Sequence, residues 1–187
     1  MRVRLPMTVL VATLAIACSD STDSPTEPLA LPVQFDHETN HHLTPLSGTE
    51  EVPNRPTSAG GQAIFHIAND GQSIGYQLIV RDITNAFQAH IHIAPAGTNG
   101  GIVVWLYPST AATPGPTGGG RLDGQIAQGV ITQTNLVGSL AGQPLSALID
   151  AIRNGTAYVN VHTSDGVAPA DTGPGDFPGG EIRGQIR

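Results

Sequence analysis

The sequence has no lysine, a single cysteine and only 4% aromatic residues. Its eight basic residues are all arginine and face 15 acidic ones, which gives a formal net charge of −7. Such a chain lacks the basic patch that neutralises a phosphate backbone, so we expect no nucleic-acid partner. One cysteine, Cys18, also excludes an internal disulfide.

Glycine and proline are abundant instead, with 23 and 15 residues, while charged residues make up only 12%. This composition indicates many tight turns between short strands rather than long helices. The hydrophobic share of 39% is enough for the core of one domain.

The first 17 residues are typical of an export signal. Arg2 and Arg4 precede a short apolar run that is too short to span a bilayer. Residues 14–18 (LAIAC) resemble a bacterial lipobox, so we expect residues 1–17 to be a cleaved lipoprotein signal peptide and Cys18 to be lipidated. The alternative is an ordinary secretory signal followed by a free thiol, which is a poor arrangement in an oxidising compartment.

Residues 18–42 are polar and rich in proline, as in a flexible tether, and residues 43–187 form the predicted domain. We expect this domain to fold alone as a monomer. Ser19 after the cysteine favours outer-membrane delivery by resemblance to enterobacterial sorting. The predicted location is the cell envelope, on its periplasmic or extracellular face.

Apolar and polar residues alternate along several segments of the domain, which indicates half-buried strands. These segments are 62–68, 73–83, 86–94, 102–107, 122–132, 157–163 and 181–187. One segment, 144–155, instead has apolar residues at helical spacing, and we predict one short helix there. The fold class predicted is all-β, a Greek-key β-sandwich or barrel of the immunoglobulin or superoxide dismutase type.

Four stretches in order resemble the chordin-type (CHRD) domain. They are 46–53 (LSGTEEVP), 89–106 (which begins AHIHIAPAGTNG), 155–163 (GTAYVNVHT) and 177–185 (FPGGEIRGQ). The resemblance implies a compact β-sandwich, found in exported bacterial proteins and in animal chordin, and no established catalytic activity. Within these stretches the motif positions are Glu50, Glu51, Pro53, Asn160 and Arg183. The segment 164–176 is longer than the loop usual before the closing motif.

Histidines recur on the polar sides of the predicted strands. His90 and His92 share one strand face, and His162 occupies the corresponding face of a later strand. Glu181 falls on the polar side of the last strand. If these strands are neighbours, the four side chains converge.

Two interpretations of this convergence remain open. Imidazole and carboxylate groups suit Cu²⁺ or Zn²⁺, and the His-x-His strand is similar to that of copper–zinc superoxide dismutases. In this case His90, His92 and His162 are the ligands, Glu181 is a weaker candidate, and affinity falls as the pH drops through about 6.5. The alternative is a hydrogen-bonded polar layer that requires no cofactor.

Other polar residues point to no site. His37, His41 and His42 fall at the end of the tether and are predicted to be solvated. The acidic residues of 164–176 lack the spacing of a calcium loop, so a solvated acidic loop is predicted there instead. The leading functional prediction is a lipid-anchored, non-enzymatic envelope module with a binding or structural role, and the alternative is a metal-binding protein. The predicted loops lack aromatic anchors, so the sequence does not specify the protein or envelope partner.

Overall fold

The structure is a computed structural model that describes residues 40–187. The predicted signal peptide, Cys18 and the tether as far as residue 39 lie outside the described residues. Contacts within the described residues form one compact unit. Among the described residues, no helix is long and apolar enough to cross a membrane.

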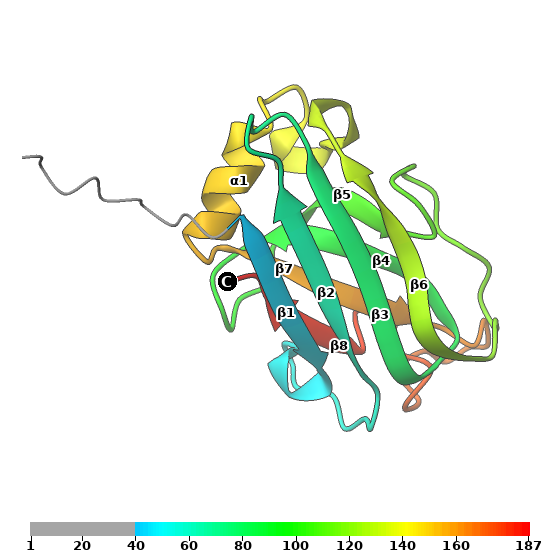
Figure 1. Ribbon diagram of the computed structural model, residues 1–187. Helices are drawn as coiled ribbons and strands as arrows, with labels where there is room; N and C mark the ends of the chain where they lie inside the picture. The colour runs from blue at the N-terminus through cyan, green and yellow to red at the C-terminus, as the bar shows by residue number, and fades with distance from the viewer. Residues whose placement is uncertain (1–39) are drawn as a thin grey trace, which may run out of the picture. The chain divides into compact units, whose positions relative to one another are not determined.

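Eight antiparallel strands form a single sheet that folds back on itself. In chain order they are β1 (His41–Ser47), β2 (Gly60–Ile67), β3 (Ile74–Thr84), β4 (Ala86–Ile93), β5 (Gly101–Tyr107), β6 (Arg121–Ile131), β7 (Ala157–Thr163) and β8 (Ile182–Gln185). Their order in the sheet is β5-β4-β7-β8-β1-β2-β3-β6. Strands β1, β2, β3 and β6 form the front layer in Figure 1, with β4, β5, β7 and β8 behind them. The all-β prediction is therefore confirmed.

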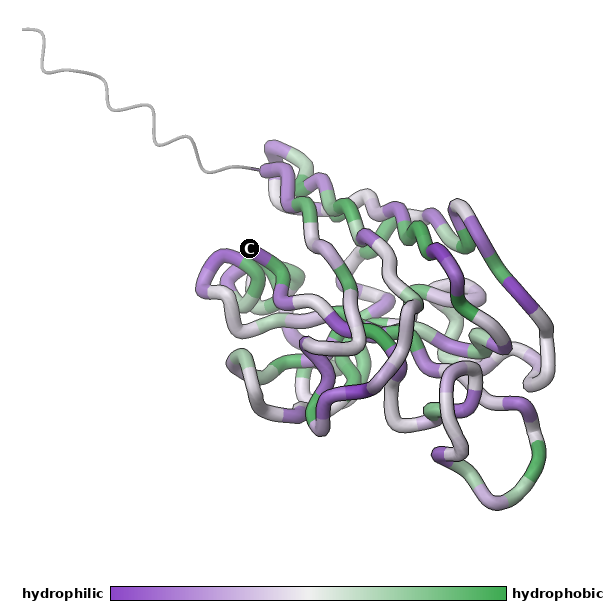
Figure 2. The backbone as a smooth tube through the Cα atoms, turned by 90° about the horizontal axis from the view of Figure 1, so that it is seen from below, coloured by the Kyte–Doolittle hydropathy of each residue, from purple (hydrophilic) through white to green (hydrophobic). Residues whose placement is uncertain are grey.

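The core lies between the two layers, where alternate residues of each strand point inward. Ala63, Phe65 and Ile67 of β2 are at most 1% exposed, as their alternation predicts. The same alternation is visible as changes between hydrophobic and hydrophilic residues along the tube in Figure 2. The inward faces of both layers therefore form the core, and their outward faces carry polar residues or are covered by loops.

The predicted helix is present as α1 (Ser146–Arg153), and it begins two residues later than Pro144. Its apolar residues Leu148, Ile149 and Ile152 are buried, and the helix contacts β7. Three short 3₁₀ helices complete the described elements: η1 (Gly48–Glu50), η2 (Gln133–Asn135) and η3 (Gly138–Leu140).

Strand β1 corrects the sequence prediction for His41 and His42. Both lie in β1, which pairs with β2 over seven positions, and His42 is buried at 4% exposure. The expectation of solvated histidines at the end of a tether was therefore wrong for His42. The inward face of β1 carries the polar residues His42 and Thr44 beside Leu46, while Leu43 is outside at 61% exposure. The hydrophobicity pattern of this segment does not indicate a strand. The segment is a strand because its backbone pairs with β2, even though polar side chains are thereby placed inside and Leu43 outside.

Tyr76 of β3 connects distant strands near the open seam of the sheet. Strands β5 and β6 are the two ends of the strand order, and they lie in contact. The Tyr76 hydroxyl donates a 2.7 Å hydrogen bond to the carbonyl oxygen of Leu106 in β5. A Cβ atom on Gly129 of β6 would stand 2.8 Å from the Tyr76 ring. The absent side chain at Gly129 therefore leaves room for this connection.

This packing predicts different effects for two similar glycine substitutions. Gly129→Ala should destabilise the protein by about 1–3 kcal/mol, because the new methyl group displaces Tyr76 and strains its hydrogen bond. Gly75→Ala is the matched control, since its Cβ would meet nothing closer than 3.9 Å. Denaturant unfolding of both variants checks the prediction, and equal stability of the two would contradict it.

Candidate metal centre

The candidate site lies on the outer face of the rear layer, opposite the core. The strand register places Trp105, His90, Asn160 and Arg183 side by side on β5, β4, β7 and β8. Their neighbours on the core face of these strands, such as Ile91 and Val159, are fully buried. Because alternate residues of a strand point to opposite faces, these polar side chains lie on the face opposite the core, as predicted.

Three buried imidazoles meet on this face. His90, His92 and His162, hereafter the histidine cluster, each offer a ring nitrogen within 4.8 Å of the other two. Nδ1 of His90 lies 3.0 Å from Nε2 of His162. Two nitrogens bound to one tetrahedral Zn²⁺ at about 2.1 Å lie roughly 3.4 Å apart. The three histidines that parity places on one polar face therefore do lie close together, as the sequence predicted, and their spacing could accommodate a metal ion.

Loop carbonyl groups fix the orientation of two of these rings. Nδ1 of His92 lies 2.9 Å from the carbonyl oxygen of Gly100, and Nδ1 of His162 lies 2.8 Å from that of Pro178. Because a carbonyl oxygen only accepts, each Nδ1 carries the proton, and each Nε2 presents its lone pair. Histidines that bind metals commonly donate their other ring N–H in this way.

Two ring nitrogens of the histidine cluster have no hydrogen-bond partner in the described part of the chain. Nε2 of His90 and Nε2 of His92 are buried and have no hydrogen-bond partner among the described residues. A structural layer would satisfy such atoms, because a buried polar group without a partner costs about 1–3 kcal/mol. A bound metal ion is one group that would use such lone pairs.

Aromatic side chains enclose the histidine cluster. The ring of Tyr158 stacks on His92 with centroids 4.8 Å apart, and the Arg183 guanidinium carbon lies 3.4 Å from the centroid of the Tyr158 ring. The ring of Trp105 lies edge-on to that of His90, with the two ring centroids 4.3 Å apart. Sequence reasoning did not identify these neighbours, because their positions depend on which strands pair.

Burial keeps the imidazoles neutral. It lowers the pKa of His90 to about 2, with further lowering by His162 and His92, and it lowers the pKa of His162 to about 4. The pKa of His92 is lowered for the same main reason. Protonation of the histidine cluster therefore requires a lower pH than the value near 6.5 expected from unperturbed histidine.

The carboxylate of Glu181 is held by hydrogen bonds to other groups and does not join the histidine cluster. Its carboxylate accepts bonds from the hydroxyls of Thr57 and Thr163, both at 2.6 Å, and from the backbone N–H of Gly175 at 2.8 Å. With these three donors it joins two loops to β7. It is not among the residues whose ligand atoms come together with the cluster.

The CHRD motif residues divide into buried and exposed groups. Arg183 is 1% exposed and donates to the Asn99 side chain and the Thr98 carbonyl. Glu51 is also buried, and burial raises its pKa to about 7 despite the opposing charge of Arg183. Asn160 lies between them and the cluster, whereas Glu50 and Pro53 are exposed.

The long segment 164–176 is attached to the domain at specific points. Arg55 forms a 3.0 Å ion pair with Asp171 and lies over the Phe177 ring. Asp176 is 3% exposed and accepts hydrogen bonds from Thr172, so the prediction of a fully solvated acidic loop was wrong here. The turn that follows supplies the Pro178 carbonyl for His162.

Comparison with known proteins identifies the family. The CHRD domain matches residues 43–186. The chain belongs to the CHRD family. No curated protein and no solved structure matches it. The family resemblance seen in the sequence is thus confirmed for the domain.

The lowered histidine pKa values predict an acid-sensitive stability for the metal-free CHRD protein. Below pH 6.5 the unfolded chain binds protons that folded His162 rejects until about pH 4. The free energy of unfolding should therefore fall as the pH drops from about 6.5 to 4, by on the order of 3 kcal/mol from His162.

Denaturant titrations of the wild type and His162→Gln across this range measure that contribution. The raised pKa of Glu51 has the opposite effect, a contribution present below about 4.5 and lost as the pH rises through about 7. Both proteins retain Glu51, so their difference cancels it. Parallel pH profiles for the two proteins would contradict the prediction.

Proposed function

We propose that this CHRD domain binds a borderline divalent metal ion, Cu²⁺ or Zn²⁺, through the histidine cluster. The observation that carries the proposal is the convergence of three ring nitrogens, one from each histidine. Nε2 of His90 and Nε2 of His92 are also buried without partners among residues 40–187. The backbone-anchored Nδ1 atoms of His92 and His162 support the proposal, because those two tautomers are already the ones that ligation through Nε2 needs. Imidazole nitrogen is a preferred ligand of both ions.

The proposed role is binding rather than catalysis. His92 and His162 are each 6% exposed, and His90 is fully buried. A substrate would need an open position on the metal and a cleft leading to it. The enclosure by Tyr158 and Trp105 favours a metal that is held or stored within the domain.

Calorimetric titration of the purified, tag-free and chelator-treated protein with Cu²⁺ and Zn²⁺ tests the proposal. We expect one metal per chain in the wild type and loss of that site in His90→Ala and in His162→Ala, because each change removes a ligand. Wild-type protein that binds neither ion, or variants that bind as well as the wild type, would contradict the proposal.

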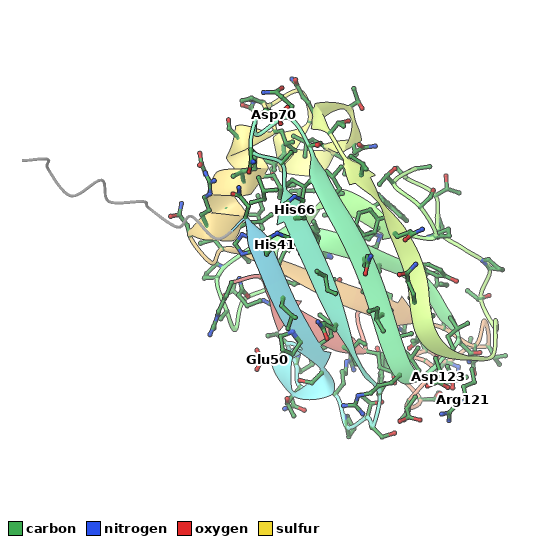
Figure 3. The ribbon with its side chains drawn as sticks, viewed as in Figure 1. His41, Glu50, His66, Asp70, Arg121 and Asp123 are labelled. Atoms are coloured by element: carbon green, nitrogen blue, oxygen red, sulfur yellow. The ribbon has the colours of Figure 1, made fainter. Side chains whose placement is uncertain are left out.

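The matched control is a double variant, His41→Ala with His66→Ala. These residues also form a close histidine pair, with ring centroids 4.2 Å apart, but they lie on the exposed outer face of β1 and β2 (Figure 3). The double variant should keep the wild-type stoichiometry. Loss of metal binding in the double variant would show instead that the metal binds at the surface pair.

We further propose that the mature chain is lipidated at Cys18 and exposes the domain from the cell envelope, with outer-membrane delivery favoured. The lipobox-like residues 14–18 and the absence of any other cysteine support this proposal. Cleavage before Cys18 removes two arginines and no acid, which changes the net charge from −7 to −9 (−7 minus 2). That charge disfavours adhesion to anionic lipid, so attachment relies on the acyl chains.

Mass spectrometry of the mature N-terminus, on protein made in a bacterial host that processes lipoproteins, tests the anchor. We expect a diacylglyceryl-modified Cys18 and recovery in the membrane fraction. Cys18→Ser is the control and should lose both properties. An unmodified thiol at the N-terminus of the wild type would overturn the proposal.

A further inference from the structure

We propose that the side-chain oxygen of Asn160 is the fourth ligand of the metal ion held by the histidine cluster. This inference rests on the proposed function and specifies its ligand set. Zinc sites are almost always four-coordinate, and three imidazoles leave one position to fill.

The register of the sheet places Asn160 beside all three histidines. It is the direct cross-strand partner of His90, and His92 lies two residues farther along β4. His162 is two residues along β7, so both side chains leave the same face of that strand. Directly paired residues have Cβ atoms about 5 Å apart, within reach of a shared ion.

The side-chain oxygen of Asn160 has no partner within the part of the protein that the structure describes. Asn160 is 3% exposed, and its Oδ1 is buried without a hydrogen-bond partner among the described residues. Its side chain also opposes the lowering of the His92 pKa. The amide of Asn160 therefore lies close enough to the His92 ring to affect it.

The nitrogen end of the same amide faces a carboxylate. A Cβ atom on Gly180 would overlap Oε1 of Glu51 and Nδ2 of Asn160, so these two atoms converge at that glycine. Gly180 has a φ of +126°, a conformation that side chains rarely adopt. Oε1 of Glu51 has no hydrogen-bond partner among the described residues, so it is available to accept from Nδ2 and hold Oδ1 toward the histidine cluster, which makes Glu51 a positioning residue.

This arrangement parallels the way carboxylates orient histidine ligands at metal sites. Here a carboxylate orients an amide, and the amide oxygen completes a set of three nitrogens and one oxygen. All four ligands are neutral, so the buried Glu51 side chain also provides nearby negative charge when ionised. With its fourth position filled, the metal has no site for an external ligand, which agrees with a binding role.

Visible spectroscopy of the Co²⁺-loaded protein, with azide as a probe of free coordination positions, tests the inference. In the wild type, azide should leave the Co²⁺ bands unchanged. In Asn160→Ala the fourth position opens, so azide should shift the bands, and Co²⁺ affinity should fall by roughly 10- to 100-fold. Glu51→Gln should weaken Co²⁺ binding while keeping the azide resistance, because the amide acceptor still orients Asn160.

Two further variants control for folding. Asn160→Asp keeps an oxygen donor and adds a charge, so it should bind Co²⁺ at least as tightly as the wild type and resist azide. Gln185→Ala removes another amide from the same face, one that bonds to the carbonyls of Ala94 and Gly155 across β7 from the cluster. It should leave Co²⁺ binding and the azide response unchanged.

The outcomes separate this inference from the proposed function. Wild-type protein that binds Cu²⁺, Zn²⁺ or Co²⁺ but responds to azide as strongly as Asn160→Ala would overturn the Asn160 assignment alone. Weaker Co²⁺ binding by Asn160→Asp than by the wild type would do the same. Wild-type protein that binds none of the three ions would overturn both proposals.

Discussion

The site depends on one constraint: a polar face of a β-sheet is buried under loops rather than exposed to water. On most sheets with one core face, the other face is solvated. Here the outer sides of β4, β7 and β8 carry histidine, asparagine, glutamate and arginine side chains that are at most 6% exposed. Each such group must find a partner within the protein, because a buried polar group without one is costly.

Most of these partners are backbone groups of the covering loops. Arg183 holds the loop after β4 through Thr98 and Asn99, while Glu181 holds the loop before β8 through Gly175. The histidines use the same loops, through Gly100 and Pro178. The side chains therefore fix the loops, and the loops in turn fix the imidazole tautomers. This reciprocity leaves one ring nitrogen of each histidine within 4.8 Å of those of the other two.

Parity arguments from the sequence predicted much of this arrangement. Alternation around His90 and His92 placed them on one face, and the apolar neighbours Ile91 and Val161 are indeed in the core. The CHRD motifs correctly indicated which strands carry the polar face. Glu181 shares that face, but its distance from the cluster could not be predicted, because it depends on hydroxyl and backbone donors from separate loops.

Other features had no sequence signal. Strand β1 has polar residues inside and Leu43 outside, so its hydrophobic pattern argues against a buried strand face. The stacking of Arg183, Tyr158 and His92 requires the pairing of β4, β7 and β8, which local patterns do not specify. The carbonyls of Gly100 and Pro178 belong to the backbone, where residue type gives no indication of role. Local alternation predicts faces, whereas long-range pairing and loop conformation decide contacts.

The central claim is that the histidine cluster is a metal site with preset tautomers. A crystal structure of Zn²⁺-soaked protein, with anomalous data at the zinc absorption edge, tests it most directly. The account predicts one strong peak bonded to Nε2 of His92 and Nε2 of His162, with both Nδ1 atoms still on the carbonyls of Gly100 and Pro178. A peak at His41 and His66 alone, or none within the cluster, would contradict it.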